Sequence, residues 1–266
     1  MNLVEQLRVL TSGTEMNAER GYLGMSMIGD SCSRKLQYSM YLVKPESEIS
    51  DRIARLFADG HAFEHKICKI LEGIGFPVTG RQISLKCEND FWSGHIDGLL
   101  EHEGKVYLVE MKTHNDKNFK NVVKMGVKKG KPVHYDQMQM YMGHGGWTHC
   151  IYIAYNKNDS DIDFQEVEFD AAHFEKLKTK SVDIIATDVL LPRIGNNSPT
   201  WYECKFCNVS DVCFGNEAPD KNCRTCTYCE PHNGNVWSCN HHVIVDMPLE
   251  SQLKGCPEHS LREMFK

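Results

Sequence analysis

Three charged residues, Asp97, Glu110 and Lys112, have the types and spacing that metal-assisted phosphodiester chemistry requires. Asp97 stands near the start of the apolar run Ile96–Leu100, and Glu110 and Lys112 lie two apart at the end of the run Val106–Met111. Residues two apart in a strand face the same side of a sheet. Carboxylates hold a hard divalent cation through oxygen, and an ammonium can orient water and stabilise charge on a phosphate. The pattern therefore indicates a divalent-metal site, the alternative being a surface hairpin with ordinary charges.

The elements that must position these residues are a hairpin and the segments before it. The two apolar runs are joined by the short polar turn Glu101–Gly104, which predicts a β-hairpin. A strand at Arg81–Cys87 is expected to add a third antiparallel strand on one side of the same sheet. Apolar residues at intervals of three and four predict a helix over Asp51–Ile74. A shorter helix is expected at Arg34–Val43, with Asp30 or Ser31 as its N-cap.

The segment after Lys112 is basic. A basic helix is expected within Asn115–Lys131, with Lys117, Lys120, Lys124 and Lys128 on one face. Gly126, Gly130 and Pro132 indicate that it ends in a mobile loop. Such a face can contact phosphates, or it can serve only as a solubilising surface. Further along the chain the pattern predicts a helix at His134–Met142, a buried strand at His149–Tyr155, an edge strand at Phe164–Phe169 and a helix at Ala171–Thr187.

Asp97 followed by Glu110-Met111-Lys112 resembles the D…(D/E)-x-K core of the PD-(D/E)xK nuclease superfamily, with Ile96 at the proline position. Two further motifs are similar to those of RecB-like members. Gly60 to Glu64 resembles their Gly-x-x-x-(Glu/His) element, and the pair Gln137 and Tyr141 resembles their Q-x-x-x-Y motif. Gln137 and Tyr141 are at i and i+4, which places them on one helix face.

The resemblance implies an α/β fold: a restriction-endonuclease-like mixed sheet flanked by helices, with a cysteine-rich, metal-stapled C-terminal region. It implies a metal-dependent DNA exonuclease acting on single-stranded or end-containing DNA, in phage or prophage DNA processing or recombination. Lys112 would position or activate the attacking water, and Gln137 and Tyr141 would place the strand. The implied ligands of Mg²⁺ or Mn²⁺ are Glu64 (with His65 or His61 as substitutes), Asp97, Glu110 and the Met111 carbonyl. The alternative function is a catalytically silent DNA- or protein-binding module on a nuclease scaffold.

Twelve cysteines without a secretion signal favour metal binding over disulfides. Cys204, Cys207 and Cys213 supply three ligands in ten residues, and Cys32 is the distant candidate for a fourth. This layout resembles the iron–sulfur staple of AddB and of CRISPR-associated RecB-like exonucleases and their phage-encoded relatives. The resemblance implies a [4Fe–4S] cluster closing a loop of about 170 residues, with Zn²⁺ at the same cysteines as the alternative.

The last fifty residues contain more metal-binding side chains than one zinc ion needs. The first choice of ligands is Cys223, Cys226, Cys239 and Cys256, with His242 or His259 as replacements. So small a segment with few apolar residues needs a staple to fold, the alternative being a flexible tail with reduced thiols.

Bulk properties agree with a globular protein of 266 residues, 41% hydrophobic and 25% charged. A net charge of −6 does not advertise nucleic-acid binding, although a local basic strip can bind DNA. We expect no membrane span and no export, and hence a location in the cytoplasm of a bacterial host cell. DNA is the expected partner, and a homo-oligomer or a phage recombination partner remains open. The expected organisation is an N-terminal helical segment with the cluster cysteine (1–50), a nuclease core (51–192), a cluster-binding segment (193–216) and a zinc-binding tail (217–266).

Overall fold

The computed structural model describes residues 2–3, 5, 20–44, 51–87 and 89–266, and it has a mixed α/β fold made of two compact units. The first unit contains the described residues of 1–19, 46–84 and 95–169. The second contains those of 20–45, 85–94 and 170–266. Much of the predicted N-terminal segment 1–50 therefore lies outside the described residues. None of the described helices is both long and apolar enough to cross a membrane.

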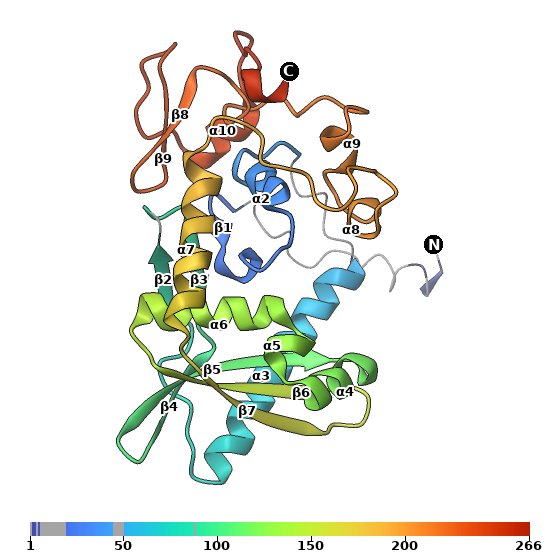
Figure 1. The fold of residues 1–266 in the computed structure, drawn as a ribbon, viewed down its shortest axis with the longest axis vertical. Coiled ribbons are helices and arrows are strands. Elements are labelled where there is room, and N and C mark those ends of the chain that lie inside the picture. The colour runs from blue at the N-terminus through green and yellow to red at the C-terminus, as the bar shows by residue number, and fades with distance from the viewer. Residues whose placement is uncertain (1, 4, 6–19, 45–50, 88) are drawn as a thin grey trace. The chain divides into compact units, whose positions relative to one another are not determined.

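A four-stranded sheet of order β4-β5-β6-β7 forms the centre of the first unit (Figure 1). Its strands are β4 (Gly98–His102), β5 (Lys105–His114), β6 (His149–Asn156) and β7 (Ile162–Glu168). The pairings β4–β5 and β6–β7 are antiparallel, whereas β5–β6 is parallel. The predicted mixed sheet is thus confirmed, with β7 at an edge.

The predicted hairpin is confirmed as β4 and β5. Its two-residue loop consists of Glu103 at φ 50° and Gly104 at φ 74°. Two successive positive φ values are typical of the type I′ turn, whose twist matches that of paired strands. Asp97 lies directly before β4, and Gly98 begins the strand opposite Val109.

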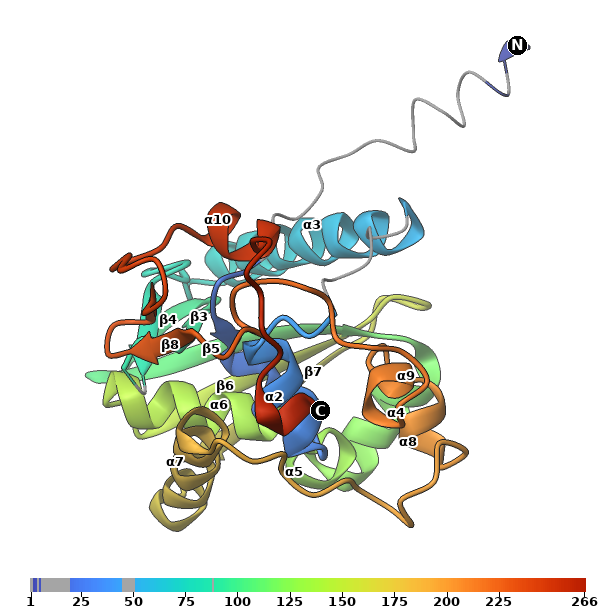
Figure 2. The ribbon, with the colours of Figure 1, turned by 90° about the horizontal axis from the view of Figure 1, so that it is seen from above.

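Helices cover both faces of this sheet. The helix α3 (Asp51–Gly73), predicted from its periodicity, lies on one face, and α4 (Asp116–Met125), α5 (Val127–Gly130) and α6 (Pro132–Gly145) lie on the other (Figures 1 and 2). One hydrophobic cluster contains Ile67 and Leu71 of α3 with Val109 and Met111 of β5. Because side chains alternate along a strand, Glu110 and Lys112 point away from this cluster.

One expectation about the sheet is wrong. The segment predicted as a third strand beside the hairpin contains β2 (Ser84–Cys87), which belongs to a separate three-stranded sheet of order β1-β3-β2, with β1 (Leu23–Gly24) and β3 (Trp92–His95). The residues just before β2 meet the hairpin instead, through an antiparallel bridge between Thr79 and Leu99. Pairing partners of a short apolar run depend on distant residues, which periodicity does not report.

The basic helix expected after Lys112 is present as α4, but it does not extend to Lys128, because the chain breaks at Gly126. This residue adopts φ +72° between α4 and α5, a conformation that suits glycine. Lys117, Lys120 and Lys124 remain exposed on α4 at helical spacing, whereas Lys128 belongs to the next helix.

The second unit carries α2 (Ser33–Met40) and α7 (Ala171–Ala186) together with the cysteine-rich end of the chain. The N-cap of α2 is Cys32 rather than Asp30 or Ser31, and the Asp30 carboxylate accepts a hydrogen bond from the Cys32 N–H at 2.9 Å. The remaining elements of this unit are η1 (Met25–Met27), α8 (Tyr202–Lys205), α9 (Ser210–Cys213), β8 (Cys229–His232), β9 (Val236–Cys239), α10 (Leu249–Lys254) and η2 (Glu263–Phe265). Residues 20–45 and 170–266 belong to the same unit, which the predicted cluster of Cys32 with Cys204, Cys207 and Cys213 requires. The division into four segments stays a prediction.

Candidate active site and metal centres

Strand β5 holds Glu110 and Lys112 side by side on one face of the sheet. It is paired on both sides, opposite β4 and β6, and this fixes its register. The Glu110 side chain is fully buried, and its Oε1 lies 2.5 Å from Nζ of Lys112, whose side chain is 28% exposed. The other oxygen, Oε2, is buried with no hydrogen-bond partner among the described residues. A buried oxygen left in this way costs free energy unless a further group binds it.

Asp97 is brought to the same place by the hairpin. Its Oδ2 accepts a hydrogen bond of 2.6 Å from the backbone N–H of Met111. The next residue, Gly98, cannot carry a side chain here, because a Cβ would lie 2.3 Å from Cγ1 of Val78. The turn into β4 is therefore closely packed and directs the Asp97 carboxylate toward the backbone between Glu110 and Lys112.

Glu64 of α3 is near the two acids, but the three do not form a tight group. Its side chain is 19% exposed, and Oε2 lies 3.7 Å from Nδ1 of His61. Burial, followed by the charge of Asp97, raises its pKa. In the described part of the chain, the ligand atoms of Glu64, Asp97 and Glu110 do not all lie within 4.8 Å of one another. Carboxylates without a cation between them repel. His65, a suggested substitute, is exposed.

The pKa values of the charged groups at this site are shifted from their ordinary values. Burial raises the pKa of Glu110 to about 7, although Lys112 opposes the shift. Burial also raises the pKa of Asp97, again against Lys112. For Lys112 itself burial acts to lower the pKa, but the carboxylates of Glu110 and Asp97 outweigh it and raise the pKa. Two buried acids with raised pKa values and an unpaired carboxylate oxygen among the described residues make this place a candidate site for a divalent cation.

The structure also places Gln137 and Tyr141 of α6 beside this pair. The Gln137 amide donates a hydrogen bond of 3.2 Å to the Tyr141 hydroxyl, and both side chains are buried. Burial raises the pKa of Tyr141, and the charge of Glu110 raises it further. Tyr141 thus stays a neutral hydroxyl that can donate or accept a hydrogen bond next to the acids.

Sequence reasoning missed three residues that extend this polar face. The Tyr152 hydroxyl is 2.8 Å from Nε2 of His114 and 2.8 Å from Nδ1 of His134. Burial lowers the pKa of His114 to about 4 and that of His134 to about 3, so both rings are neutral at pH 7. His114 follows Lys112 by two residues on the same strand face, and this spacing could have identified it. Tyr152 lies opposite Glu110 on β6, a neighbour that only the fold reveals.

The four predicted cluster cysteines come near one another in the second unit. Burial raises the pKa of the Cys204 and Cys207 thiols, and the charges of Cys32 and Cys213 raise both further. No three of these sulfur atoms lie within 4.8 Å of one another in the described chain.

The tail cysteines surround a single cavity of about 210 Å³. All five cysteines between 223 and 256 line it, together with His241, His242 and His259. Burial and then the charges of Cys256, Cys239 and Cys226 raise the pKa of Cys223 to about 11. No three of the four predicted sulfur atoms lie within 4.8 Å of one another among the described residues.

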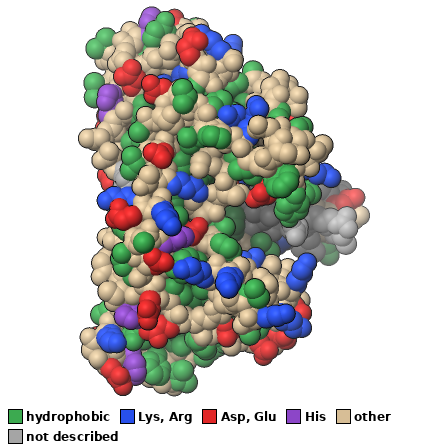
Figure 3. Space-filling view, in the orientation of Figure 1, with side chains coloured by type: hydrophobic (Ala, Val, Ile, Leu, Met, Phe, Trp, Pro, Cys, Tyr) green, Lys and Arg blue, Asp and Glu red, His purple; other side chains and the backbone are tan. Residues whose placement is uncertain are grey.

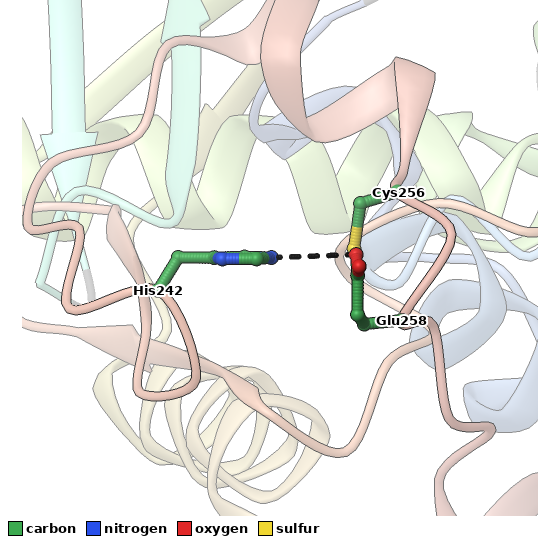
Figure 4. Close-up of side chains that lie close together, drawn as sticks. All are labelled: His242, Cys256 and Glu258. Atoms are coloured by element: carbon green, nitrogen blue, oxygen red, sulfur yellow. Dashed lines mark ion pairs between the residues drawn. The ribbon is translucent and has the colours of Figure 1, made fainter.

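One group of three ligand atoms within 4.8 Å occurs among the described residues, and it lies in this tail: His242, Cys256 and Glu258 (Figure 4). His242 Nε2 is 3.7 Å from a Glu258 oxygen. His242 was a predicted replacement ligand, whereas Glu258 was not considered.

No family model matches the chain, and no curated protein matches it. Three solved structures similar to it are exonucleases. An alkaline exonuclease, LHK-Exo from Laribacter hongkongensis, is 20% identical at a TM-score of 0.48 over 62% of this chain and 87% of its own. LHK-Exo in complex with dAMP is 20% identical at 0.46 over 63% and 88%. A phage related exonuclease from Haemophilus somnus 129PT is 14% identical at 0.43 over 61% and 91%. With TM-scores below 0.5, these similarities carry no functional conclusion.

Proposed function

We propose that the chain is a metal-dependent deoxyribonuclease of the PD-(D/E)xK superfamily that hydrolyses phosphodiester bonds. The observation that carries the proposal is the buried carboxylate of Glu110. One of its oxygens lies against Lys112, and the other has no hydrogen-bond partner in the part of the chain that the structure describes. A non-catalytic scaffold gains no stability from burying a carboxylate with an unpaired oxygen. Asp97, held at the Met111 N–H, adds a second carboxylate to the same place.

The residues that would hold Mg²⁺ or Mn²⁺ are Asp97, Glu110 and the Met111 carbonyl, with Glu64 reaching in from α3. Oxygen donors of this kind suit both cations. A bound divalent cation would lower the pKa of water and offset the phosphate charge.

The chain's own groups then have separate roles. Lys112, which keeps its proton because of the neighbouring acids, orients the attacking water and stabilises charge on the phosphate. The hydroxyl of Tyr141 and the amide of Gln137 position the DNA strand through hydrogen bonds. Exposed Lys117, Lys120 and Lys124 on α4 supply cations for the phosphate backbone. Acidic and basic side chains are mixed over the face drawn in Figure 3, so the positive charge of these lysines is a local feature.

We propose further that the enzyme is an exonuclease acting on single-stranded or end-containing DNA in phage or prophage DNA processing, in the cytoplasm of a bacterial host cell. The same proposal assigns a [4Fe–4S] cluster to Cys32, Cys204, Cys207 and Cys213, supported by their mutual effects on pKa. It assigns a zinc ion in the tail to Cys223, Cys226, Cys239 and Cys256.

The test is degradation of end-labelled single- and double-stranded DNA in Mg²⁺ or Mn²⁺ by the wild type, Glu110→Ala and Lys112→Ala. Both variants should lose activity by about 100-fold or more. The matched control is Lys105→Ala, an exposed lysine on the same strand but on its other face, which should retain it. Undiminished cleavage by both variants would refute the assignment. Metal-independent DNA binding with no cleavage by the wild type would favour the silent module instead.

A further inference from the structure

One of several contacts between the tail and the N-terminal segment is made by a short turn, residues 222–225. Its side chains are polar yet almost fully buried: Asn222 and Arg224 are each 2% exposed, and Thr225 is 0% exposed. Within the turn, the Thr225 N–H donates to Asn222 Oδ1 at 3.1 Å, and the Cys226 N–H donates to the Cys223 carbonyl at 3.0 Å. Buried polar groups of this kind are stable only when their partners are in place.

Arg224 and Asn222 find those partners on a different stretch of the chain. Arg224 Nη1 donates to the carbonyl of Met40 at 2.9 Å and Nη2 to that of Gly21 at 3.0 Å. The Asn222 amide donates to the carbonyl of Leu42 at 2.7 Å. The last carbonyls of a helix have no partner within the helix. The turn therefore caps the carboxyl end of α2, and the amino end of α2 is Cys32.

The tail has little apolar material with which to hold this turn in shape. Its buried hydrophobic residues, all within the described chain, are Cys226, Cys229, Trp237, Cys239 and Met247. Three of the five are cysteines that line the metal cavity. Segments of this size fold stably when a metal or disulfide replaces the missing core, and all twelve cysteines are free.

One backbone group of the tail already contacts a predicted ligand. The His242 N–H donates to Cys239 Sγ at 3.5 Å.

We propose that the tail zinc ion orders the turn 222–225. The ordered turn holds the carboxyl end of α2 through its hydrogen bonds, and this restricts the motion of α2 and of Cys32 at its other end. Cys223 stands between Asn222 and Arg224, so a metal bond at its sulfur fixes the backbone from which both side chains project. Zinc in the tail is thus coupled to the segment that carries the first cluster cysteine. The inference rests on the zinc site proposed above.

The test is hydrogen–deuterium exchange of peptides covering residues 33–43 in the full-length protein, with zinc content measured on the same samples. The double variant Cys223→Ser/Cys226→Ser should lose one equivalent of zinc and exchange roughly tenfold faster in this region. Arg224→Gln should exchange faster while keeping its zinc, because it breaks the clamp but not the metal site. Cys68→Ser, a thiol of α3 in the other unit, should change neither.

Zinc removal from the wild type by a chelator, followed by zinc addition, checks that the double variant has not simply misfolded. Exchange should accelerate on removal and recover on addition. Unchanged metal content in the double variant would overturn the zinc site on which the inference rests. Loss of zinc with unchanged exchange over 33–43, or unchanged exchange in Arg224→Gln, would overturn the coupling alone.

Discussion

Replacing Glu110 by glutamine should stabilise the metal-free protein above pH 7. Burial raises the pKa of this carboxyl from 4.5 to about 7, a value already net of its attraction to Lys112. A shift of about 2.5 units at ~1.4 kcal/mol each makes the ionised group cost about 3 kcal/mol in the folded state. Because the folded pKa lies above the unfolded one, the carboxyl does not lower the free energy of unfolding below pH 4.5. It lowers this free energy by about 3 kcal/mol as pH rises through about 7. Glutamine stays neutral, so the variant does not lose this free energy.

The assay is denaturant unfolding with chelator at pH 4.5 and at pH 8. Buried His114 and His134 titrate with the opposite sign, since their lowered pKa values make stability rise from about pH 4 to 6.5. Only the difference between Glu110→Gln and wild type isolates the carboxyl. That difference should be near zero at pH 4.5 and about 3 kcal/mol in favour of the variant at pH 8. Glu101→Gln, exposed on β4, is the matched control and should differ by less than about 0.5 kcal/mol at both values.

Divalent cation should cancel most of this difference in stability. At a concentration of about 100 times Kd the wild type should gain about 2.7 kcal/mol, whereas Glu110→Gln should gain little. A variant no more stable than wild type at pH 8 without metal would refute the electrostatic reasoning. Equal gains from metal in both proteins would refute Glu110 as a ligand.

Three further outcomes are expected. Tyr152→Phe removes the hydroxyl shared by two buried imidazoles and should cost about 1–3 kcal/mol in thermal or denaturant unfolding; no loss would show that the rings have other partners. Gly98→Ala should cost about 1–3 kcal/mol, because its Cβ would lie 2.3 Å from a neighbouring valine methyl, whereas Gly73→Ala, with nothing within 4 Å, should be neutral or slightly stabilising; equal melting temperatures would contradict this. Wild-type protein purified anaerobically should contain iron and show the brown colour of a [4Fe–4S] cluster, and Cys204→Ser should lose both. Zinc without iron in the wild type would contradict the cluster.

Local features of this chain were predictable because their causes are local. The hairpin follows from two apolar runs and the Glu103-Gly104 turn, and α3 follows from its periodicity. Pairings between distant segments were not. The apolar run at Ser84–Cys87 has no mark that assigns it to β3 rather than to β4, because only the completed packing decides this. The break at Gly126 likewise depends on a conformation that the residue permits but does not require.

The residues of the candidate site were predictable from the sequence, but their protonation states were not. Asp97, Glu110 and Lys112 could be identified from alternation and spacing. Their protonation could not, because it depends on burial and on charges that only the fold brings together, such as those of Asp97 and Glu64 at Glu110. At pH 7 the rings of His114 and His134 are neutral, Lys112 carries a positive charge, and Glu110 lies near the midpoint of its titration. A divalent cation that binds at Glu110, as proposed, has to displace the proton from this carboxyl. Cation binding should therefore release a proton and strengthen as pH rises through about 7, which titration calorimetry in buffers of different ionisation enthalpy would measure.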